Sequence, residues 1–135
     1  MKTTNYYNTF IEVAEDCPVE SAEVPPLRDS KSVVRTQYEM ISEHPYTYTS
    51  DDVLFAIHAE KHEIPPEQQT AGREQFFSKG RACLRSSALG KRYGWGIHFD
   101  AEGKMAIYGI GSDKYHELKN DTNVKHLKAM RSRRG

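Results

Sequence analysis

The clearest candidate for a binding site is the segment 79–98, which contains five basic residues and no acidic residue. The same segment holds four glycines, two serines and two aromatic residues. Arginine presents forked donors to phosphate or carboxylate groups, and glycine lets backbone N–H groups approach an anion. Aromatic rings add flat surfaces on which a base or another ring can stack. We therefore predict that a small anionic ligand, such as a nucleotide or a phosphorylated metabolite, binds to Arg85, Ser86, Ser87, Lys91, Arg92, Tyr93, Trp95 and His98.

A structural role for the same residues is the competing interpretation. Gly94 and Gly96 flank Trp95 and could permit a bulge that directs the indole into the core. Arg85 and Lys91 could pair with carboxylates of the acidic first half of the chain. The sequence leaves both interpretations open, because spacing along the chain does not show which side chains converge.

An enzyme that uses Cys83 or His98 in this pocket is an alternative function. Arg81 and Arg85 flank Cys83, and positive neighbours favour the nucleophilic thiolate form of a cysteine. His98 is a candidate base, but no third residue is placed to orient it. If residues 81–86 form a strand, Cys83 is equally well explained as an edge residue without a catalytic role.

His58 and His62 have the i, i+4 spacing that places two imidazoles on one side of a helix. This spacing can bind a transition metal, but the zinc-protease pattern requires a glutamate where Ala59 stands. No third ligand is evident, and we favour a solvated polar helix face with two unrelated histidines. We therefore predict neither a metal nor a cofactor.

Two nucleic-acid or nucleotide motifs fail at required positions. Gly90 and Lys91 end a stretch that resembles a P-loop, but Arg85 replaces its first glycine and Arg92 its final serine or threonine. Residues 91–99 resemble an RNA-binding strand motif only in part, since Arg92 again occupies a glycine position. We do not expect a nucleic-acid partner.

The charge of the chain is balanced overall but divided between its halves. Lysine plus arginine and aspartate plus glutamate each number 19, which excludes a uniformly basic nucleic-acid binder. Residues 1–78 hold 14 acids and 6 bases, whereas residues 79–135 hold 5 acids and 13 bases. Such asymmetry favours attraction of an anionic ligand, or association of two copies. An interaction protein or homodimer without a small-molecule site is thus a further alternative.

The sequence also predicts where the protein resides. The first twenty residues contain no signal-peptide core, and the longest apolar run, residues 53–57, is far shorter than the ~20 residues that span a bilayer. Two cysteines are too few for a disulfide framework. We expect a soluble cytoplasmic protein without membrane contact.

Hydrophobic periodicity, prolines and glycines predict one α+β domain over residues 1–135, with a flexible basic tail at about 131–135. An N-terminal strand and three helices precede a β-meander or hairpin, a short helix and a C-terminal strand, although residues 124–132 also fit a helix. Ser50 is the expected N-cap of the second helix. The expected elements are a strand at 9–14, helices at 32–43, 50–64 and 65–80, a possible strand at 81–86, a hairpin of 95–99 with 104–110, and a helix after 112.

Alternation within the hairpin separates its side chains onto two faces. Trp95, Ile97 and Phe99 share one face, which Met105 and Ile107 can join from the partner strand; His98 and Tyr108 then point the other way.

Several segments of the sequence resemble a family of small bacterial proteins that is known only as a domain of unknown function. These segments are residues 5–14, 37–41, 48–53, 91–98 and 129–132. The resemblance covers nearly the whole chain and implies a single-domain protein. It implies no activity, cofactor or catalytic residue.

Overall fold

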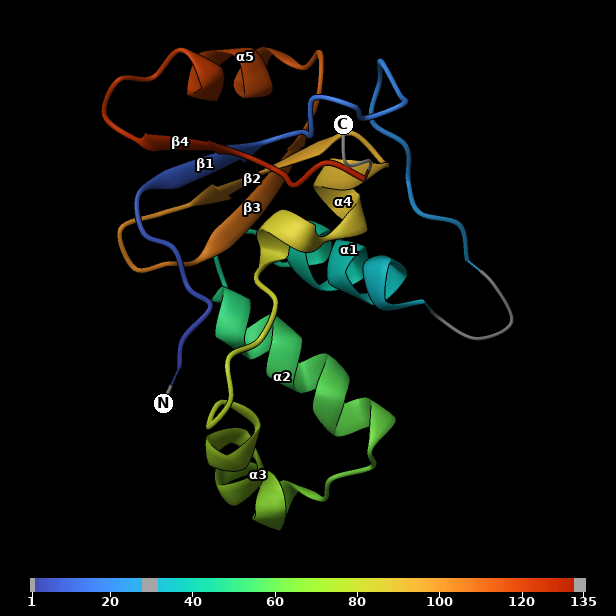
Figure 1. The fold of residues 1–135 in the computed structure, drawn as a ribbon, viewed down its shortest axis with the longest axis vertical. Coiled ribbons are helices and arrows are strands. Elements are labelled where there is room, and N and C mark those ends of the chain that lie inside the picture. Colours follow the sequence, from blue (N-terminus) through green and yellow to red (C-terminus); the bar gives the residue numbers. More distant parts are fainter. Residues whose placement is uncertain (1, 28–31, 133–135) are drawn as a thin grey trace.

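The computed structural model describes residues 2–27 and 32–132, which form a mixed four-stranded sheet with helices on both sides (Figure 1). The strand order is β3-β2-β1-β4, in which β1 and β2 pair antiparallel, β2 and β3 pair antiparallel, and β1 and β4 pair parallel. The strands are β1 (Thr9–Glu12), β2 (Trp95–Phe99), β3 (Met105–Gly109) and β4 (Lys125–Lys128).

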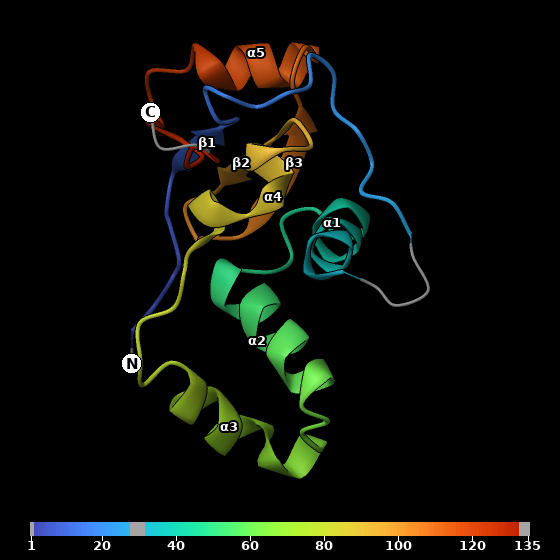
Figure 2. The ribbon, with the colours of Figure 1, turned by 45° about the vertical axis from the view of Figure 1, so that its right-hand side comes forward.

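The helices divide between the two faces of the sheet and a separate projection. They are α1 (Val33–Glu43), α2 (Ser50–Lys61), α3 (Gln69–Phe76), α4 (Ala88–Lys91) and α5 (Asp113–Lys119), with 3₁₀ turns at Pro66–Gln68 and Leu84–Ser86. Helix α5 covers one face, α1 and α4 cover the other, and α2 with α3 extends away from the sheet (Figures 1 and 2). The predicted α+β class is confirmed.

The core on the α1 face follows the predicted alternation. Ile97, Phe99 and Met105 are at most 1% exposed and pack with Ile11 of the neighbouring strand. The hairpin pairs residue for residue from Trp95 to Phe99, so the bulge considered for Trp95 is absent from these strands.

The core on the α5 face is smaller and rests on one aromatic pair. Phe10 and Tyr115 meet edge to face with ring centroids 5.1 Å apart. Gly96 lies under both rings, since a Cβ there would lie 2.7 Å from each of them. The glycine therefore permits the close approach of α5 to the sheet.

Helix α2 begins one residue earlier than predicted and anchors the N-terminal segment. Thr49, not Ser50, is its N-cap and forms a capping box with Asp52. The buried Asp51 carboxylate accepts hydrogen bonds from the Thr4 backbone N–H and the Thr4 hydroxyl, both at 2.7 Å. This capping and anchoring fix the base of the α2–α3 projection.

The expected strand at residues 81–86 is wrong. The chain has no regular structure at Arg81–Cys83 and then forms the 3₁₀ turn at Leu84–Ser86, because the Ser86 N–H bonds to the Cys83 carbonyl at 3.0 Å and Leu84 is buried. The turn satisfies the Cys83 and Leu84 carbonyls locally, and the Arg85 carbonyl accepts from the Met130 N–H at 2.8 Å.

The C-terminal segment, for which the sequence left a strand and a helix open, contains a strand. Residues Lys125–Lys128 form a strand, and most of the expected basic tail at 131–135 lies outside the described residues. Arg131, which is described, pairs with Glu15. Within the described part of the chain, no helix is long and apolar enough to span a membrane.

Candidate functional site

Arg85, Ser86 and Ser87 lie in the turn before α4 and bond mainly to the protein itself. The Arg85 Nε donates to the carbonyl of Lys128 at 2.9 Å. The Ser87 hydroxyl donates to the side-chain oxygen of the buried Gln37 at 2.6 Å. Two of these three predicted ligand residues therefore hold α1 and β4 against the turn.

Trp95 and His98 lie on opposite faces of the sheet. The Trp95 indole N–H donates to the Glu23 carbonyl at 2.8 Å, and its ring packs against Tyr38 of α1. His98 lies on the α5 face, where its Nδ1 is 2.8 Å from the Tyr46 hydroxyl. The structure does not bring these two predicted residues together.

Lys91, Arg92 and Tyr93 line two adjoining clefts of about 500 Å³ each. Arg92 contributes to both clefts, and Asp16 lines the first one beside the two cations. Within the described residues neither Arg85 nor Lys91 forms an ion pair, so the expected pairing with the acidic first half is not observed there. A ligand-binding role of these residues stays a prediction.

Cys83 and His98 belong to separate environments. The Cys83 thiol lies 3.0 Å from the hydroxyl of Tyr6, whose ring packs on Phe99 in the α1-face core. Burial, followed by this bond to Cys83, raises the pKa of Tyr6 to about 12. His98 lies on the other face, so the structure does not form a Cys83–His98 catalytic pair.

Tyr46, His98 and Tyr108 form a hydrogen-bonded cluster that the sequence did not predict. The Tyr46 hydroxyl bonds to His98 and also to the Tyr108 hydroxyl at 2.9 Å. Burial, followed by the charge of Lys114, lowers the pKa of His98, and burial with the Tyr108 contact raises that of Tyr46. The imidazole is thus neutral at pH 7. Tyr46 lies in a loop at a φ of 56°, and no sequence pattern places that loop beside β2.

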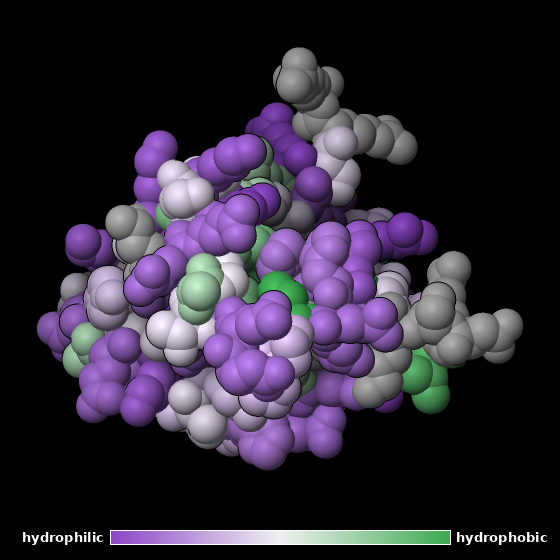
Figure 3. Space-filling view, turned by 90° about the horizontal axis from the view of Figure 1, so that it is seen from below, coloured by the Kyte–Doolittle hydropathy of each residue, from purple (hydrophilic) through white to green (hydrophobic). Residues whose placement is uncertain are grey.

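The two histidines considered as a metal site line a basic pocket of about 370 Å³ between α2, α3 and residues 78–81. We call it the α2–α3 pocket. Its lining contains no acidic residue and consists of His58, His62, Ile64, Gly72, Gln75, Phe76, Ser78, Lys79 and Arg81. Lys79 and Arg81 are the first two bases of the acid-free segment. Seen from the α3 end, the molecular surface is predominantly hydrophilic (Figure 3).

Four planar side chains form a continuous run of contacts in the α2–α3 pocket. The Arg81 guanidinium carbon lies 4.1 Å from the Phe76 ring centroid. The His58 ring lies 4.4 Å from that of Phe76 and 4.4 Å from that of His62. Arg81 is also fixed by a 2.8 Å hydrogen bond from its Nε to the Phe76 carbonyl. These contacts hold Arg81 and the two imidazoles in defined positions.

The electrostatics of the α2–α3 pocket favour an anion over a metal. Partial burial, followed by the positive charges of His62, Arg81 and Lys61, lowers the pKa of His58. Among the described residues no group of three His, Cys, Asp or Glu side chains is placed to hold a metal ion. A metal here would have two imidazole ligands beside several positive charges, whereas an anion would offset those charges.

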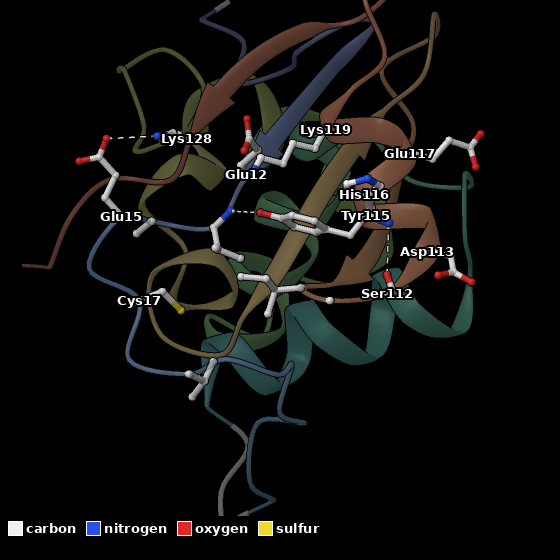
Figure 4. Close-up of a pocket in the computed structure, with 15 residues that line it drawn as sticks. Glu12, Glu15, Cys17, Ser112, Asp113, Tyr115, His116, Glu117, Lys119 and Lys128 are labelled. Carbon is white, nitrogen blue, oxygen red and sulfur yellow. Dashed lines mark hydrogen bonds and ion pairs between the residues drawn. The ribbon is translucent and has the colours of Figure 1, made fainter.

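A larger cavity lies elsewhere, between α5 and the chain that leaves β1 (Figure 4). It has a volume of about 700 Å³, and we call it the α5 cavity. Its lining comes from residues 12–19, 110–119 and 128, which are far apart in the sequence. Sequence patterns gave no signal for this cavity, because the parallel pairing of β1 with β4 and the packing of α5 create it.

Comparison with known proteins identifies a family but no characterised relative. No curated protein and no solved structure matches the chain. One family model matches residues 1–135, that is, the entire chain. The chain therefore belongs to DUF6157, a family of unknown function.

Proposed function

We propose that the protein binds a small anionic ligand, of the phosphate or carboxylate class, in the α2–α3 pocket. The observation that carries this proposal is an acid-free lining in which Arg81, Lys79 and two imidazoles face one space. Neither Arg81 nor Lys79 forms an ion pair within the described chain. A ligand anion would supply the negative charge that no carboxylate of the described chain places beside these two cations.

The orientation of Arg81 supports recognition of a group with several oxygens. Its Nε is bonded to the Phe76 carbonyl and its guanidinium lies over the Phe76 ring. The two terminal nitrogens have no acceptor among the described residues and remain available as a fork. A guanidinium fixed in this way loses less conformational freedom when it binds phosphate or carboxylate.

His58 supplies charge that depends on pH. In the free pocket the neighbouring cations oppose protonation of His58, and a bound anion would favour it. Binding is thus coupled to proton uptake in the range where imidazole titrates.

The setting that we propose for this function is the bacterial cytoplasm. The proposal of a bacterial origin rests on the resemblance of several sequence segments to a family of small bacterial proteins. The proposal of the cytoplasm rests on the two cysteines, because both are free thiols and thiols stay reduced in that compartment.

Calorimetric titration with pyrophosphate, inorganic phosphate and citrate tests the proposal. We expect at least one of them to bind, and Arg81→Gln to weaken that binding about tenfold or more. Arg92→Gln is the matched control, because Arg92 is an exposed arginine in a different cleft and forms no ion pair with any residue that the structure describes. Equal affinity of wild type and Arg81→Gln, or a loss confined to Arg92→Gln, would exclude the α2–α3 pocket as the site.

A further inference from the structure

The α5 cavity has the size and lining of a second ligand site, independent of the anion pocket. Its volume of about 700 Å³ lies within the ~300–1,000 Å³ range of small-molecule pockets. Figure 4 shows its polar side chains: Glu12 comes from β1, and Tyr115 and Lys119 come from α5. Val13, Val19 and Ile110 add apolar surface.

Tyr115 places a hydrogen-bond donor at the floor of the α5 cavity. Its side chain is buried, and its ring is fixed edge to face against Phe10. The hydroxyl oxygen accepts a hydrogen bond from the Val13 backbone N–H at 3.0 Å, shown as a dashed line in Figure 4. Burial raises the pKa of Tyr115, so the hydroxyl keeps its proton. Within the described residues that proton has no acceptor, and it is available to a ligand.

Glu12 places an acceptor in the same cavity. Its side chain is 13% exposed, and its carboxylate forms no hydrogen bond to any described residue. The Nδ1 of His126 lies 4.0 Å from this carboxylate. A carboxylate withdrawn from water without a bonded cation favours a ligand that brings a positive donor.

Lys119 completes the arrangement with a positive charge at the rim. Its side chain extends over the cavity toward the Glu12 side (Figure 4), and its ammonium forms no ion pair within the described chain. Lys128, the other lysine of the lining, is already paired with Glu15 at 3.2 Å. The cavity thus combines the Glu12 carboxylate, the Lys119 ammonium and the Tyr115 hydroxyl with an apolar wall.

We propose that the α5 cavity binds a free α-amino acid with an apolar side chain. The ligand ammonium bonds to Glu12, the ligand carboxylate accepts from Lys119 and from the Tyr115 hydroxyl, and the side chain packs on Val13, Val19 and Ile110. A ligand with only an amine would leave Lys119 and Tyr115 without a partner, and a ligand with only a carboxylate would leave Glu12 without one.

Three probes of the same carbon skeleton test the proposal: L-leucine, 3-methylbutylamine, which lacks the carboxylate, and 4-methylpentanoate, which lacks the ammonium. We expect L-leucine to bind about tenfold or more tightly than either analogue. The backbone amide signal of Val13 should shift on titration, because this N–H donates to the Tyr115 hydroxyl. Absence of leucine binding at millimolar concentration, or equal binding of the three probes, would overturn the proposal.

Variants of residues that line the α5 cavity test whether leucine binds there. Glu12→Gln and Tyr115→Phe should each weaken leucine binding about tenfold, whereas Glu117→Gln should not, because Glu117 is a rim residue paired with Lys114. If Tyr115→Phe fails to fold, Lys119→Gln replaces it, since Lys119 is exposed and has no ion pair in the described part of the chain. Unchanged affinity in Glu12→Gln contradicts the assignment. Arg81→Gln leaves leucine binding intact, so this proposal and the anion proposal fail separately.

Discussion

The Tyr46 hydroxyl lies 2.8 Å from Nδ1 of His98, although Tyr46 follows α1 and His98 faces the opposite side of the sheet. The loop between α1 and α2 passes the edge strand β3, where the Tyr46 N–H donates to the Met105 carbonyl at 2.7 Å. A left-handed backbone conformation at Tyr46 is the geometric condition for this crossing. The contact links the two faces of the fold around β3.

Replacing Tyr46 with phenylalanine tests the value of this link. We expect Tyr46→Phe to lower the free energy of unfolding by about 1–2 kcal/mol, because bonds to both His98 and Tyr108 are lost. Urea denaturation provides the measurement. Tyr7→Phe is the matched control and should change stability little, since Tyr7 is 49% exposed and its hydroxyl has no bonding partner in the described chain. Equal stability of the two variants would show that the Tyr46 hydrogen bonds contribute no net stability.

The lowered pKa of His98 predicts the direction of a stability change with pH. The folded state binds a proton at His98 less readily than the unfolded state, whose imidazole titrates near the ordinary value of about 6.5. Stability from this group is therefore complete above about pH 6.5 and declines as the pH falls below it. Unfolding free energies at about pH 7.5 and about pH 5.5 should differ less in His98→Gln than in the wild type. An identical difference in both proteins would contradict the assignment.

Anion affinity in the α2–α3 pocket should rise as the pH falls. The cations around His58 lower its pKa in the free protein, and a bound anion raises it again, so protonation and binding favour each other. Sulfate is the suitable probe, because its charge is constant over this range. We expect its affinity to increase severalfold from about pH 7.5 to about pH 6, and the increase to shrink in a His58→Gln, His62→Gln double variant. The same pH dependence in the wild type and the double variant would place the titrating groups elsewhere.

Gly96→Ala tests the close packing of α5. The added methyl group would lie 2.7 Å from atoms of both the Phe10 and Tyr115 rings, so we expect a loss of about 1–3 kcal/mol in unfolding free energy. Gly80→Ala is the control, because the added Cβ would lie 4.0 Å from the flexible Lys2 side chain, which is an ordinary contact distance. Thermal denaturation distinguishes the two, and a Gly96→Ala protein as stable as the control would show that α5 shifts without cost.

The sequence determined the parts of this protein that depend on local chemistry. Alternation placed Ile97 and Phe99 on one face of the hairpin and His98 on the other, and a glycine with φ of 81° at Gly103 closes the predicted turn. The acidic first turn at Asp51 and Asp52 indicated the start of α2, although the N-cap is Thr49 and not the predicted Ser50. Neighbours in the chain specify these features, so a single sequence contains the information.

Tertiary structure alone decided which side chains share a space. The predicted ligand residues lie close together in the sequence, between Arg85 and His98. In the structure Arg85 and Ser87 bond to Lys128 and Gln37, whereas Lys91, Arg92 and Tyr93 line two other clefts. The α2–α3 pocket and the α5 cavity instead join residues from distant segments. Strand order and helix packing arise from the burial of apolar surface across the whole chain, and spacing along one segment does not encode them.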